Sequence, residues 1–314
     1  MTAETFAAQF RALSTEEVPL PGAGYTGRRH RLLFEIGRRD LSLARLAEAH
    51  WDAVAILEEN GSKPKTDCLY GVWASERPGQ AVTLERHEDS FRINGKKMFC
   101  SGAGLVDHAL ITVNGPDPQL VDIDLRKNAR SIQFDNSGWK TNAFGETNTS
   151  TASFQNVSVS LDGLIGAPGW YLQRPGFWHG ACGPAACWAG GAAGLVDYAK
   201  AQSRDDAHTL AHLGAMRASI WALLAYLDSA GREIDAAPHD RESAVVRTLT
   251  VRHLVEQACT DVLRRLPRAY GPHPLAMDEE ISRRYQELDL YLRQSHAERD
   301  LEALGRAMKI APPQ

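Results

Sequence analysis

The hydrophobic and polar positions along the chain change their period twice. From Arg28 to Asn60, apolar side chains recur three and four positions apart, which is typical of helices that bury one face. Between Lys65 and Ser160 the period becomes that of short strands rich in β-branched and aromatic residues, with turn residues between them. From Phe177 onward the helical period returns in long stretches. The pattern predicts helices, then a β domain, then a helical bundle.

This order defines the predicted fold, an α+β multidomain chain. A short N-terminal helical domain covers residues 1–64, with a helix break near Gly37 and an end at Asn60-Gly61. An antiparallel β-barrel domain covers residues 65–162, and a C-terminal four-helix bundle covers residues 163–314. The strand-forming runs of the β domain are LYGVWA, AVTLERH, FRI, KKMFC, HALITV, QLVDIDL, SIQFD and STASFQNVSVS.

Segments of small residues carry specific expectations. Asn94-Gly95 lies between two strand-forming runs and tolerates the positive φ of a two-residue turn, so it predicts a hairpin. The second run ends in Ser101-Gly102-Ala103-Gly104, whose lack of bulk leaves room for a flat or bulky ligand near the backbone. A tight loop with nothing bound is the alternative. In the bundle, small residues from Gly183 to Gly194 indicate close helix packing or a subunit contact.

Composition excludes several classes of protein. With 314 residues, 43% of them hydrophobic, and a net charge of −4, the chain is an ordinary globular protein without a basic block for nucleic acid. No apolar run approaches membrane-spanning length, and the first residues lack a secretory signal. The five cysteines are irregularly spaced, which favours neither a disulfide framework nor a zinc site. We therefore expect a cytoplasmic protein that binds no metal, nucleic acid or membrane.

Motifs within this order resemble the acyl-CoA dehydrogenase family of flavoproteins. The segment WASERPG, from Trp73 to Gly79, is similar to the family's Thr-Glu-Pro strand end, and KKMFCSGAG is similar to its Trp-x-Thr segment. STASFQNVSVSLDGLIG and GPAACWAGGAAGLVDYAKAQSR resemble the exit of its β domain and its first bundle helix. The resemblance implies that Ser75, Phe99 and Ser101 lie against the ring of an FAD, with Ser101 and backbone N–H groups bonding its polar edge.

The resemblance also implies a site for the pyrophosphate of FAD, although the family's motifs are altered. AQSRDDAH stands where the family has an arginine and a Gln-Phe-Gly segment, which leaves Arg204 as the nearby cation. RLPRAYG stands where the family has a glycine-rich turn, and it supplies Arg265, Tyr270 and Gly271. Arginines can clamp a diphosphate through paired hydrogen bonds. The alternative is that Arg204 and Arg265 are solvated charges at helix ends.

The position of the family's catalytic glutamate is occupied here by Arg293. Just beyond it, Ser295 and Glu298 have the spacing of a capping box and predict that a helix starts there. His296 then falls in the first helical turn, where the helix dipole would keep its imidazole neutral and able to act as a general base. The alternative is a solvent-facing histidine without a catalytic role.

Three functions are open on these residues. The first is an FAD-dependent dehydrogenase of an acyl thioester, in which a base removes the α-proton while hydride passes from the β-carbon to the flavin. The second is a flavin-dependent monooxygenase or oxidase on the same fold, and the third is a non-catalytic relative that has lost its flavin. The resemblance also implies that bundle helices pair between subunits, which gives a homodimer or homotetramer.

Overall fold

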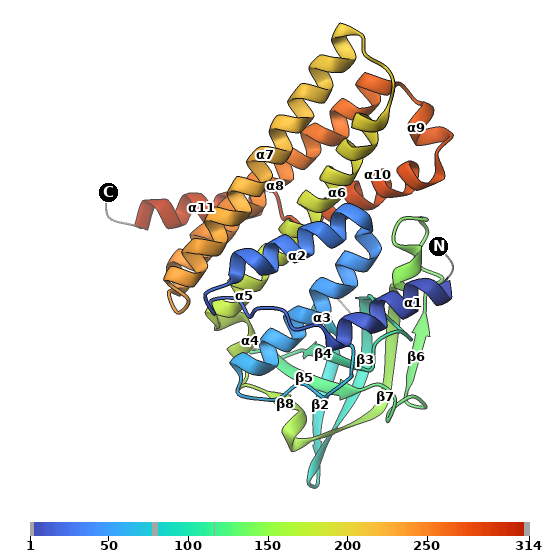
Figure 1. The fold of residues 1–314 in the computed structure, drawn as a ribbon. Coiled ribbons are helices and arrows are strands. Elements are labelled where there is room, and N and C mark those ends of the chain that lie inside the picture. The colour runs from blue at the N-terminus through green and yellow to red at the C-terminus, as the bar shows by residue number, and fades with distance from the viewer. Residues whose placement is uncertain (1–2, 77–80, 116, 311–314) are drawn as a thin grey trace. The chain divides into compact units, whose positions relative to one another are not determined.

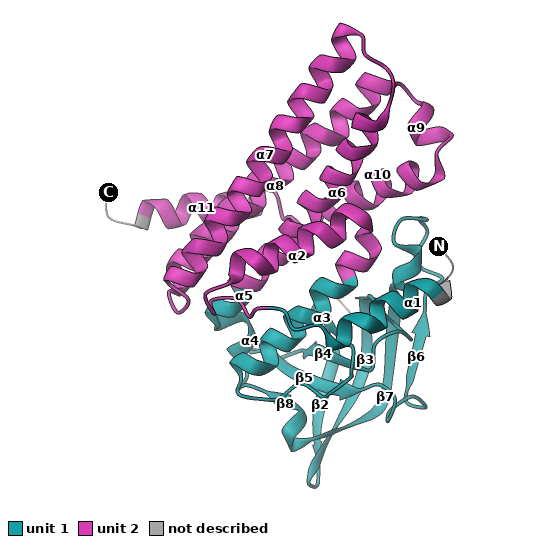
Figure 2. Cartoon of the chain, viewed as in Figure 1, with its two compact units in different colours: residues 1–18, 46–177 teal, residues 19–45, 178–314 magenta. Residues whose placement is uncertain are grey.

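The computed structural model describes residues 3–76, 81–115 and 117–310 (Figure 1). The chain divides into two compact units, each made of two separate segments (Figure 2). Unit 1 comprises residues 1–18 and 46–177 and contains the described β-strands, whereas unit 2 comprises residues 19–45 and 178–314 and is helical. Helix α3 (Leu41–Glu59) begins in unit 2 and continues into unit 1. The three-domain division at residues 64 and 162 stays a prediction.

Unit 1 is built around two four-stranded sheets, with the orders β1-β4-β5-β8 and β2-β3-β7-β6. The predicted runs are confirmed as strands, and FRI and KKMFC form one continuous strand. The strands are β1 (Tyr70–Trp73), β2 (Val82–His87), β3 (Ser90–Cys100), β4 (His108–Val113), β5 (Gln119–Asp124), β6 (Ile132–Asp135), β7 (Ser150–Ser160) and β8 (Leu164–Ile165). Short helical segments join or flank them: α1 (Ala3–Ala12), η1 (Leu13–Thr15), η2 (Gly145–Thr147), η3 (Leu161–Gly163), α4 (Trp170–Gln173) and α5 (Pro175–Gly180).

The first sheet is mixed, which corrects the prediction of a wholly antiparallel domain. β1 and β4 are parallel, with Tyr70 beside His108, whereas β4 and β5 are antiparallel. Between β1 and β4 the chain forms β2 and β3 of the second sheet, and it returns to β4 in the direction of β1. The described strand pairings form two ladders and show no closed barrel.

The hairpin predicted at Asn94-Gly95 is wrong. β3 runs through both residues, and the turn that joins it to β2 lies at Glu88-Asp89. The register of β3 against β7 shifts at Asn94, where β7 has one residue more than β3, so the bulge lies in β7. Glycine is required there because a Cβ on residue 95 would lie 2.1 Å from the carbonyl oxygen of Ala81.

Unit 2 is a bundle of helices in which α2 packs closely on α6. A Cβ on Gly190 would lie 2.2 Å from the carbonyl oxygen of Phe34, and a Cβ on Gly37 would lie 2.6 Å from that of Cys187. The small residues of α6 therefore permit close packing inside the chain, one of the two predicted roles. The helices are α2 (Thr26–Arg39), α6 (Cys182–Ala201), α7 (Ala207–Ala236), α8 (Arg241–Tyr270), α9 (His273–Ala276), α10 (Glu279–Leu292) and α11 (Glu298–Ile310).

The break between α2 and α3 lies at Asp40 rather than at Gly37. The Asp40 carboxylate accepts a hydrogen bond from the amide of Leu43 at 2.8 Å, so its side chain caps α3. The predicted end at Asn60-Gly61 is confirmed, and Gly61 has a φ of +77°. Glycine 37 thus serves helix packing, and an N-cap aspartate makes the break.

Helix α7 differs from the expectation that no run reaches membrane-spanning length. Among the described helices it alone is long and apolar enough to cross a membrane, although core helices of soluble proteins meet the same test. Only 17% of its most apolar stretch is buried within this chain. Leu210 and Trp221, 49% and 67% exposed, lie about three turns apart on one side of the helix. α7 therefore has an open apolar side.

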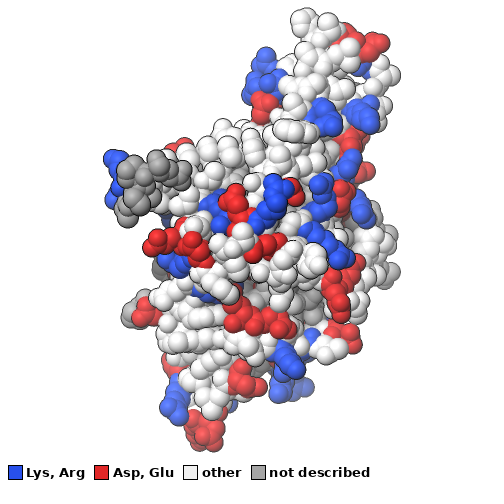
Figure 3. All heavy atoms as spheres, turned by 60° about the vertical axis from the view of Figure 1, so that its left-hand side comes forward, with Lys and Arg blue, Asp and Glu red and all other residues white. Residues whose placement is uncertain are grey.

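Acidic and basic side chains are interspersed on the face shown in Figure 3. On the face shown in Figure 3 neither sign forms a broad field. Several ion pairs join neighbouring turns of one helix, such as Arg232 with Asp228 and Arg306 with Glu302. Exposed pairs of this kind each add little stability. The face in Figure 3 offers no single-sign field of the kind that steers a charged polymer.

Candidate functional site

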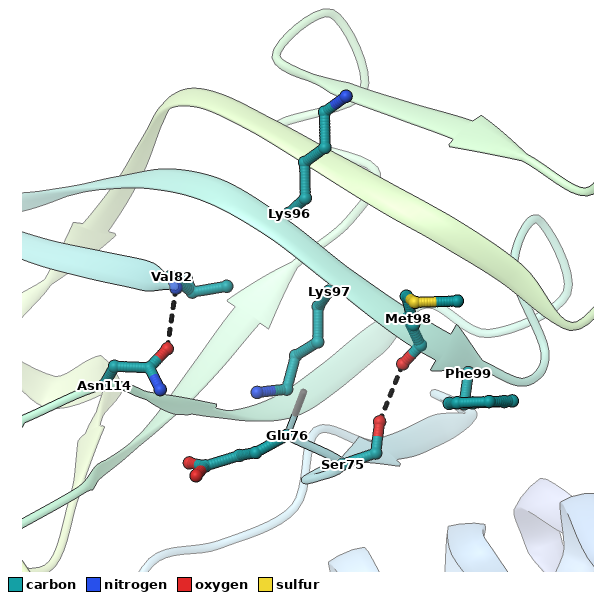
Figure 4. A pocket seen from close by; sticks show the side chains of 8 residues that line it. All are labelled: Ser75, Glu76, Val82, Lys96, Lys97, Met98, Phe99 and Asn114. Atoms are coloured by element: carbon teal, nitrogen blue, oxygen red, sulfur yellow. Dashed lines mark hydrogen bonds between the residues drawn. The ribbon is translucent and has the colours of Figure 1, made fainter. Parts of the chain in front are cut away.

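The first candidate site lies in unit 1, where β1 and β3 end beside each other (Figure 4). Ser75, just beyond β1, donates a hydrogen bond from Oγ to the carbonyl oxygen of Met98 at 2.8 Å. This bond places Ser75 next to Phe99, so the structure brings together the two segments that the resemblance paired. Of the WASERPG segment, residues 77–79 lie outside the described residues. Contact of these residues with a flavin stays a prediction.

Phe99 presents an aromatic ring at this surface. It is 53% exposed, and its φ of +59° lies in the left-handed region that bulky residues avoid. The register of β3 against β7 shifts between Lys97 and Cys100, and this bulge changes the direction in which Phe99 points. A strained backbone that displays an aromatic ring is typical of a ligand contact.

Behind Ser101 lies a chain of hydroxyl groups. Ser101 Oγ is 2.9 Å from Thr149 Oγ1, which is 2.8 Å from Thr147 Oγ1. Thr147 donates its hydroxyl proton to the carbonyl oxygen of Phe144 at 2.8 Å. Because a carbonyl oxygen only accepts, Thr149 must donate to Thr147, and Ser101 must donate to Thr149. Ser101 therefore offers only lone pairs to a ligand.

The other polar groups of this turn are backbone amides. Those of Ser101 and Gly102 donate to carbonyl oxygens within the protein, at 3.0 and 2.7 Å. Those of Ala103 and Gly104 make no hydrogen bond with the described residues. Because Ser75 also donates its proton internally, the site combines two acceptor hydroxyls with two available amide donors. Sequence reasoning found the small residues, but it missed the threonines that fix the direction of the hydroxyls.

Lys97 lies buried beside these strand ends, with 3% of its surface exposed. Its Nζ donates to the carbonyl oxygen and to Oγ1 of Thr112, at 2.7 and 2.9 Å, and so joins β3 to β4. Burial lowers the pKa of the Lys97 ammonium, and the Glu76 carboxylate opposes this shift. Figure 4 shows the amine pointing to the side on which Glu76 and Asn114 lie. Sequence reasoning missed Lys97, because a lysine is seldom buried.

The residues expected to hold a pyrophosphate lie in unit 2. The Tyr270 hydroxyl donates to the carbonyl oxygen of Ala199 at 2.7 Å and so joins the ends of α8 and α6. Gly271 ends α8 with a φ of +69°. Arg204 is exposed and pairs with Asp206, the N-cap of α7, at 2.7 Å. Three of the four predicted residues thus gather where α6, α7 and α8 meet.

Arg265 lies slightly earlier on α8. Its Nε donates to Asp261 at 2.5 Å, and its Nη1 is 3.4 Å from Nδ1 of His212. The side-chain bonds that Arg204 and Arg265 make are the ones expected of charges at helix ends. Binding of a pyrophosphate here stays a prediction.

The capping box predicted at Ser295 is not formed, which changes the surroundings of His296. α11 begins at Glu298, so His296 precedes the helix and does not lie in its first turn. Its amide donates to Asp300 Oδ2 at 3.1 Å, and its Nδ1 lies 3.3 Å from Asp300 Oδ1. Arg293 is exposed and bonds to Asp289 one turn earlier. Catalytic roles for His296 and Arg293 stay predictions.

Arg252, which sequence reasoning did not single out, holds the segment that contains His296. Its guanidinium donates to the carbonyl oxygens of Ala181 and Gln294, both at 2.8 Å, and lies 4.7 Å from the ring centre of Trp188. Arg252 is separated from Tyr270 by eighteen positions of the same helix, or about 27 Å. Unit 2 therefore keeps the predicted base and the predicted pyrophosphate residues far apart.

No protein-family profile matches the chain, and no curated protein matches it significantly. Solved structures do match. Dibenzothiophene monooxygenase TdsC from Paenibacillus sp. A11-2 has a TM-score of 0.78 at 18% identity, over 96% of this chain and 95% of that chain. Methanesulfinate monooxygenase MsuC from Pseudomonas fluorescens has a TM-score of 0.78 at 17% identity, over 99% and 97%. KijD3, solved with FMN and a dTDP-linked keto sugar, has a TM-score of 0.81 at 13% identity, over 98% and 87%.

These matches extend over nearly the whole chain. The chain has the acyl-CoA dehydrogenase-like fold. The resemblance found in the sequence is therefore confirmed for the fold, while an acyl-CoA dehydrogenase activity is not shown. Among the described residues, no group of three or more His, Cys, Asp or Glu side chains could hold a metal ion. At such low identity the matches show the fold alone, so activity has to be argued from the residues of this chain.

Proposed function

We propose that this protein is a flavin-dependent monooxygenase. The proposal rests on the resemblance, which aligns Arg293 with the family's glutamate base, because a guanidinium only donates hydrogen bonds and cannot remove an α-proton. The likeness to TdsC and MsuC, two monooxygenases with this fold, supports the same choice over an acyl-CoA dehydrogenase. When bound and reduced, the flavin would supply the electrons that activate dioxygen.

The residues of the site in unit 1 fit a flavin ring. An isoalloxazine is flat, and its polar edge carries one N–H group among several acceptor atoms. The exposed ring of Phe99 offers an apolar surface, and the lone pairs of Ser75 and Ser101 suit the N–H group. The amides of Ala103 and Gly104 are donors for the acceptor atoms. These residues would hold and orient the ring.

We propose FMN rather than FAD as the cofactor. Arg204, Arg265 and Tyr270 already bond to partners in unit 2, and FMN needs no adenosine site. The TdsC and KijD3 complexes contain FMN. Titration of the purified protein with FMN and with FAD, followed by flavin fluorescence, tests this proposal. We expect FMN to bind about tenfold more tightly, or by about 1.4 kcal/mol. Tighter binding of FAD would contradict it.

The activity itself is tested with labelled oxygen. The FMN-loaded protein is photoreduced without oxygen and mixed with ¹⁸O₂ and indole, dibenzothiophene or methanesulfinate. A monooxygenase places one atom of ¹⁸O in the product and the other in water, and one flavin is oxidised for each dioxygen consumed. Bleaching of the flavin by acyl-CoA thioesters without oxygen would contradict the proposal and favour the acyl-CoA dehydrogenase function. A protein that binds no flavin would be the non-catalytic relative.

We also propose that copies of the chain associate through the open apolar side of α7. The small residues of α6 are covered by α2 of the same chain. The side of α7 that carries Leu210 and Trp221 is therefore the better surface for association between subunits. Light scattering is expected to give a dimer or tetramer for the natural protein and a smaller species for Trp221→Glu. Met277→Glu is the matched control, because Met277 is 75% exposed outside α7. A monomeric natural protein at micromolar concentration would contradict the proposal.

A further inference from the structure

A cavity lies in unit 1 away from the candidate flavin site, and none of the residues assigned to that site line it. Its volume is about 650 Å³, which is within the range of small-molecule sites. The loop between α3 and β1, the end of β5 and the end of β7 contribute its walls. Leu57, Val159 and Ile165 give it an apolar patch, and the rest of the lining is mostly polar.

His108 lies at the wall of this cavity and is only 8% exposed. Its Nδ1 is 2.9 Å from Oδ1 of Asp122, and its ring stacks on that of Tyr70 with centres 5.0 Å apart. Because a carboxylate accepts, Nδ1 carries the proton and Nε2 is the remaining polar atom of the ring. Nε2 makes no hydrogen bond with any described residue. The ring of His108 is thus largely buried, and its one polar atom without a protein partner is left for a ligand of the cavity.

The acidic groups of the cavity are largely satisfied by the protein. Asp122 accepts from His108, and Asp124 accepts from the amide of Lys127 at 2.8 Å. Asp162 accepts from Ser160, and this bond lowers the pKa of Asp162. Asp89 lies at the cavity without such a bond among the described residues.

The basic groups of the cavity are exposed and have no partner in the described part of the protein. Lys63, Lys65 and Lys127 line it, and their ammonium groups make no hydrogen bond or ion pair with the described residues. Lys65 and Lys127 are close enough to Asp162 to act on its charge, but not to bond with it. The cavity therefore offers a ligand three exposed ammonium groups and Nε2 of His108.

We infer that this cavity binds a small phosphate monoester. A phosphate carries several acceptor oxygens, which can bond to the lysines, and the P–OH group of its monoanion can donate to Nε2 of His108. Inorganic phosphate would leave most of the cavity empty, whereas the organic part of an ester can cover Leu57, Val159 and Ile165. Asp122 orients His108 for this contact. The inference does not rest on the proposed monooxygenase activity, and its test uses no flavin.

Calorimetric titration with glycerol 3-phosphate, in a phosphate-free buffer of low ionic strength, tests the inference. Glycerol and inorganic phosphate are titrated alongside. We expect the ester to bind more tightly than inorganic phosphate and glycerol not to bind. The Lys65→Met, Lys127→Met double variant should bind the ester about tenfold more weakly than the natural protein, and His108→Gln should weaken binding by a similar factor. Lys140→Met is the matched control, because Lys140 is an exposed lysine outside the cavity. The affinity of this variant for the ester should equal that of the natural protein.

The lysine variant keeps the test decisive if His108→Gln fails to fold, because both lysines are exposed. Equal affinity of the natural protein and the double lysine variant would overturn the inference, as would the absence of ester binding by the natural protein. Sedimentation with vesicles that contain phosphatidic acid is the last measurement. Binding to these vesicles without binding of the soluble ester would assign the site to a lipid headgroup and overturn the small-molecule inference.

Discussion

The direction of the hydroxyl chain behind Ser101 leads to a quantitative prediction. Thr149→Val keeps the shape of the side chain and removes the hydroxyl that accepts from Ser101 and donates to Thr147. Thr149 is 5% exposed and Thr147 is fully buried, so water does not replace the second bond. Two lost hydrogen bonds of this kind should lower the free energy of unfolding by about 1–3 kcal/mol.

The matched control is Thr149→Ser, which keeps both bonds and loses one methyl group. Its cost should be about 1 kcal/mol, from apolar burial alone. Urea unfolding followed by tryptophan fluorescence gives both values. Thr149→Val should therefore be less stable than Thr149→Ser.

A double-mutant cycle isolates the bond between Ser101 and Thr149. Ser101→Ala removes the donor, so after Thr149→Val it should cost about 1 kcal/mol less than in the natural protein. A coupling energy below about 0.3 kcal/mol would refute the hydrogen bond between Ser101 and Thr149, on which the direction of the chain depends, because the two hydroxyls would then be energetically independent.

Three further predictions concern single residues. Phe99→Gly should be more stable than Phe99→Ala by about 1 kcal/mol, because only glycine adopts the positive φ without strain. Thermal unfolding measures both variants, and an alanine variant at least as stable as the glycine variant would contradict the strain. Arg252→Met should lower the free energy of unfolding by about 2–4 kcal/mol, because the substitution leaves two carbonyl oxygens without their donor. Arg252→Lys should be intermediate between this variant and the natural protein. Unchanged midpoints of urea unfolding would exclude this role of Arg252. Lys97 has a folded pKa below 10.5, so the natural protein should gain stability relative to Lys97→Met as pH rises from the folded pKa toward 10.5, because the unfolded chain binds more protons there. Because the Lys97 charge acts on Cys100, whose pKa burial raises to about 12, both proteins are compared with Cys100→Ala in place, and a pH-independent difference would contradict the shift.

The strands and long helices could be predicted from the sequence because their side chains follow the period of the element that they form. The errors arose where one residue type serves two purposes. Gly95 has the signature of a turn, but it is needed for close approach to Ala81, and glycine gives the same signal in one sequence for both roles. Asp40 rather than Gly37 breaks the N-terminal helices, because an aspartate that caps outweighs a glycine that packs.

The candidate site was partly within reach of the sequence. Ser75, Phe99 and Ser101 were found through their motifs, and the structure places Ser75 beside Phe99. Thr147 and Thr149 could not be found, because isolated threonines carry no pattern and their role depends on bonds across the fold. The surroundings of His296 were misjudged, because Asp300 accepts from the amide of His296, and Ser295 accepts from the amide of Ala297 rather than from that of Glu298.

The close packing of α2 on α6 has a consequence for the synthesis of the protein. About 140 residues separate the end of α2 from the start of α6, and at about 5–20 residues per second their translation takes about 7–30 s. During this interval Phe34 and Gly37 lack the helix against which they pack in the folded protein. α10 is translated later still, and its Arg284 bonds to the carbonyl oxygens at the end of α2. The strands of unit 1 therefore leave the ribosome before unit 2 can fold, and the apolar face of α2 remains available to chaperones until the last helices have been made.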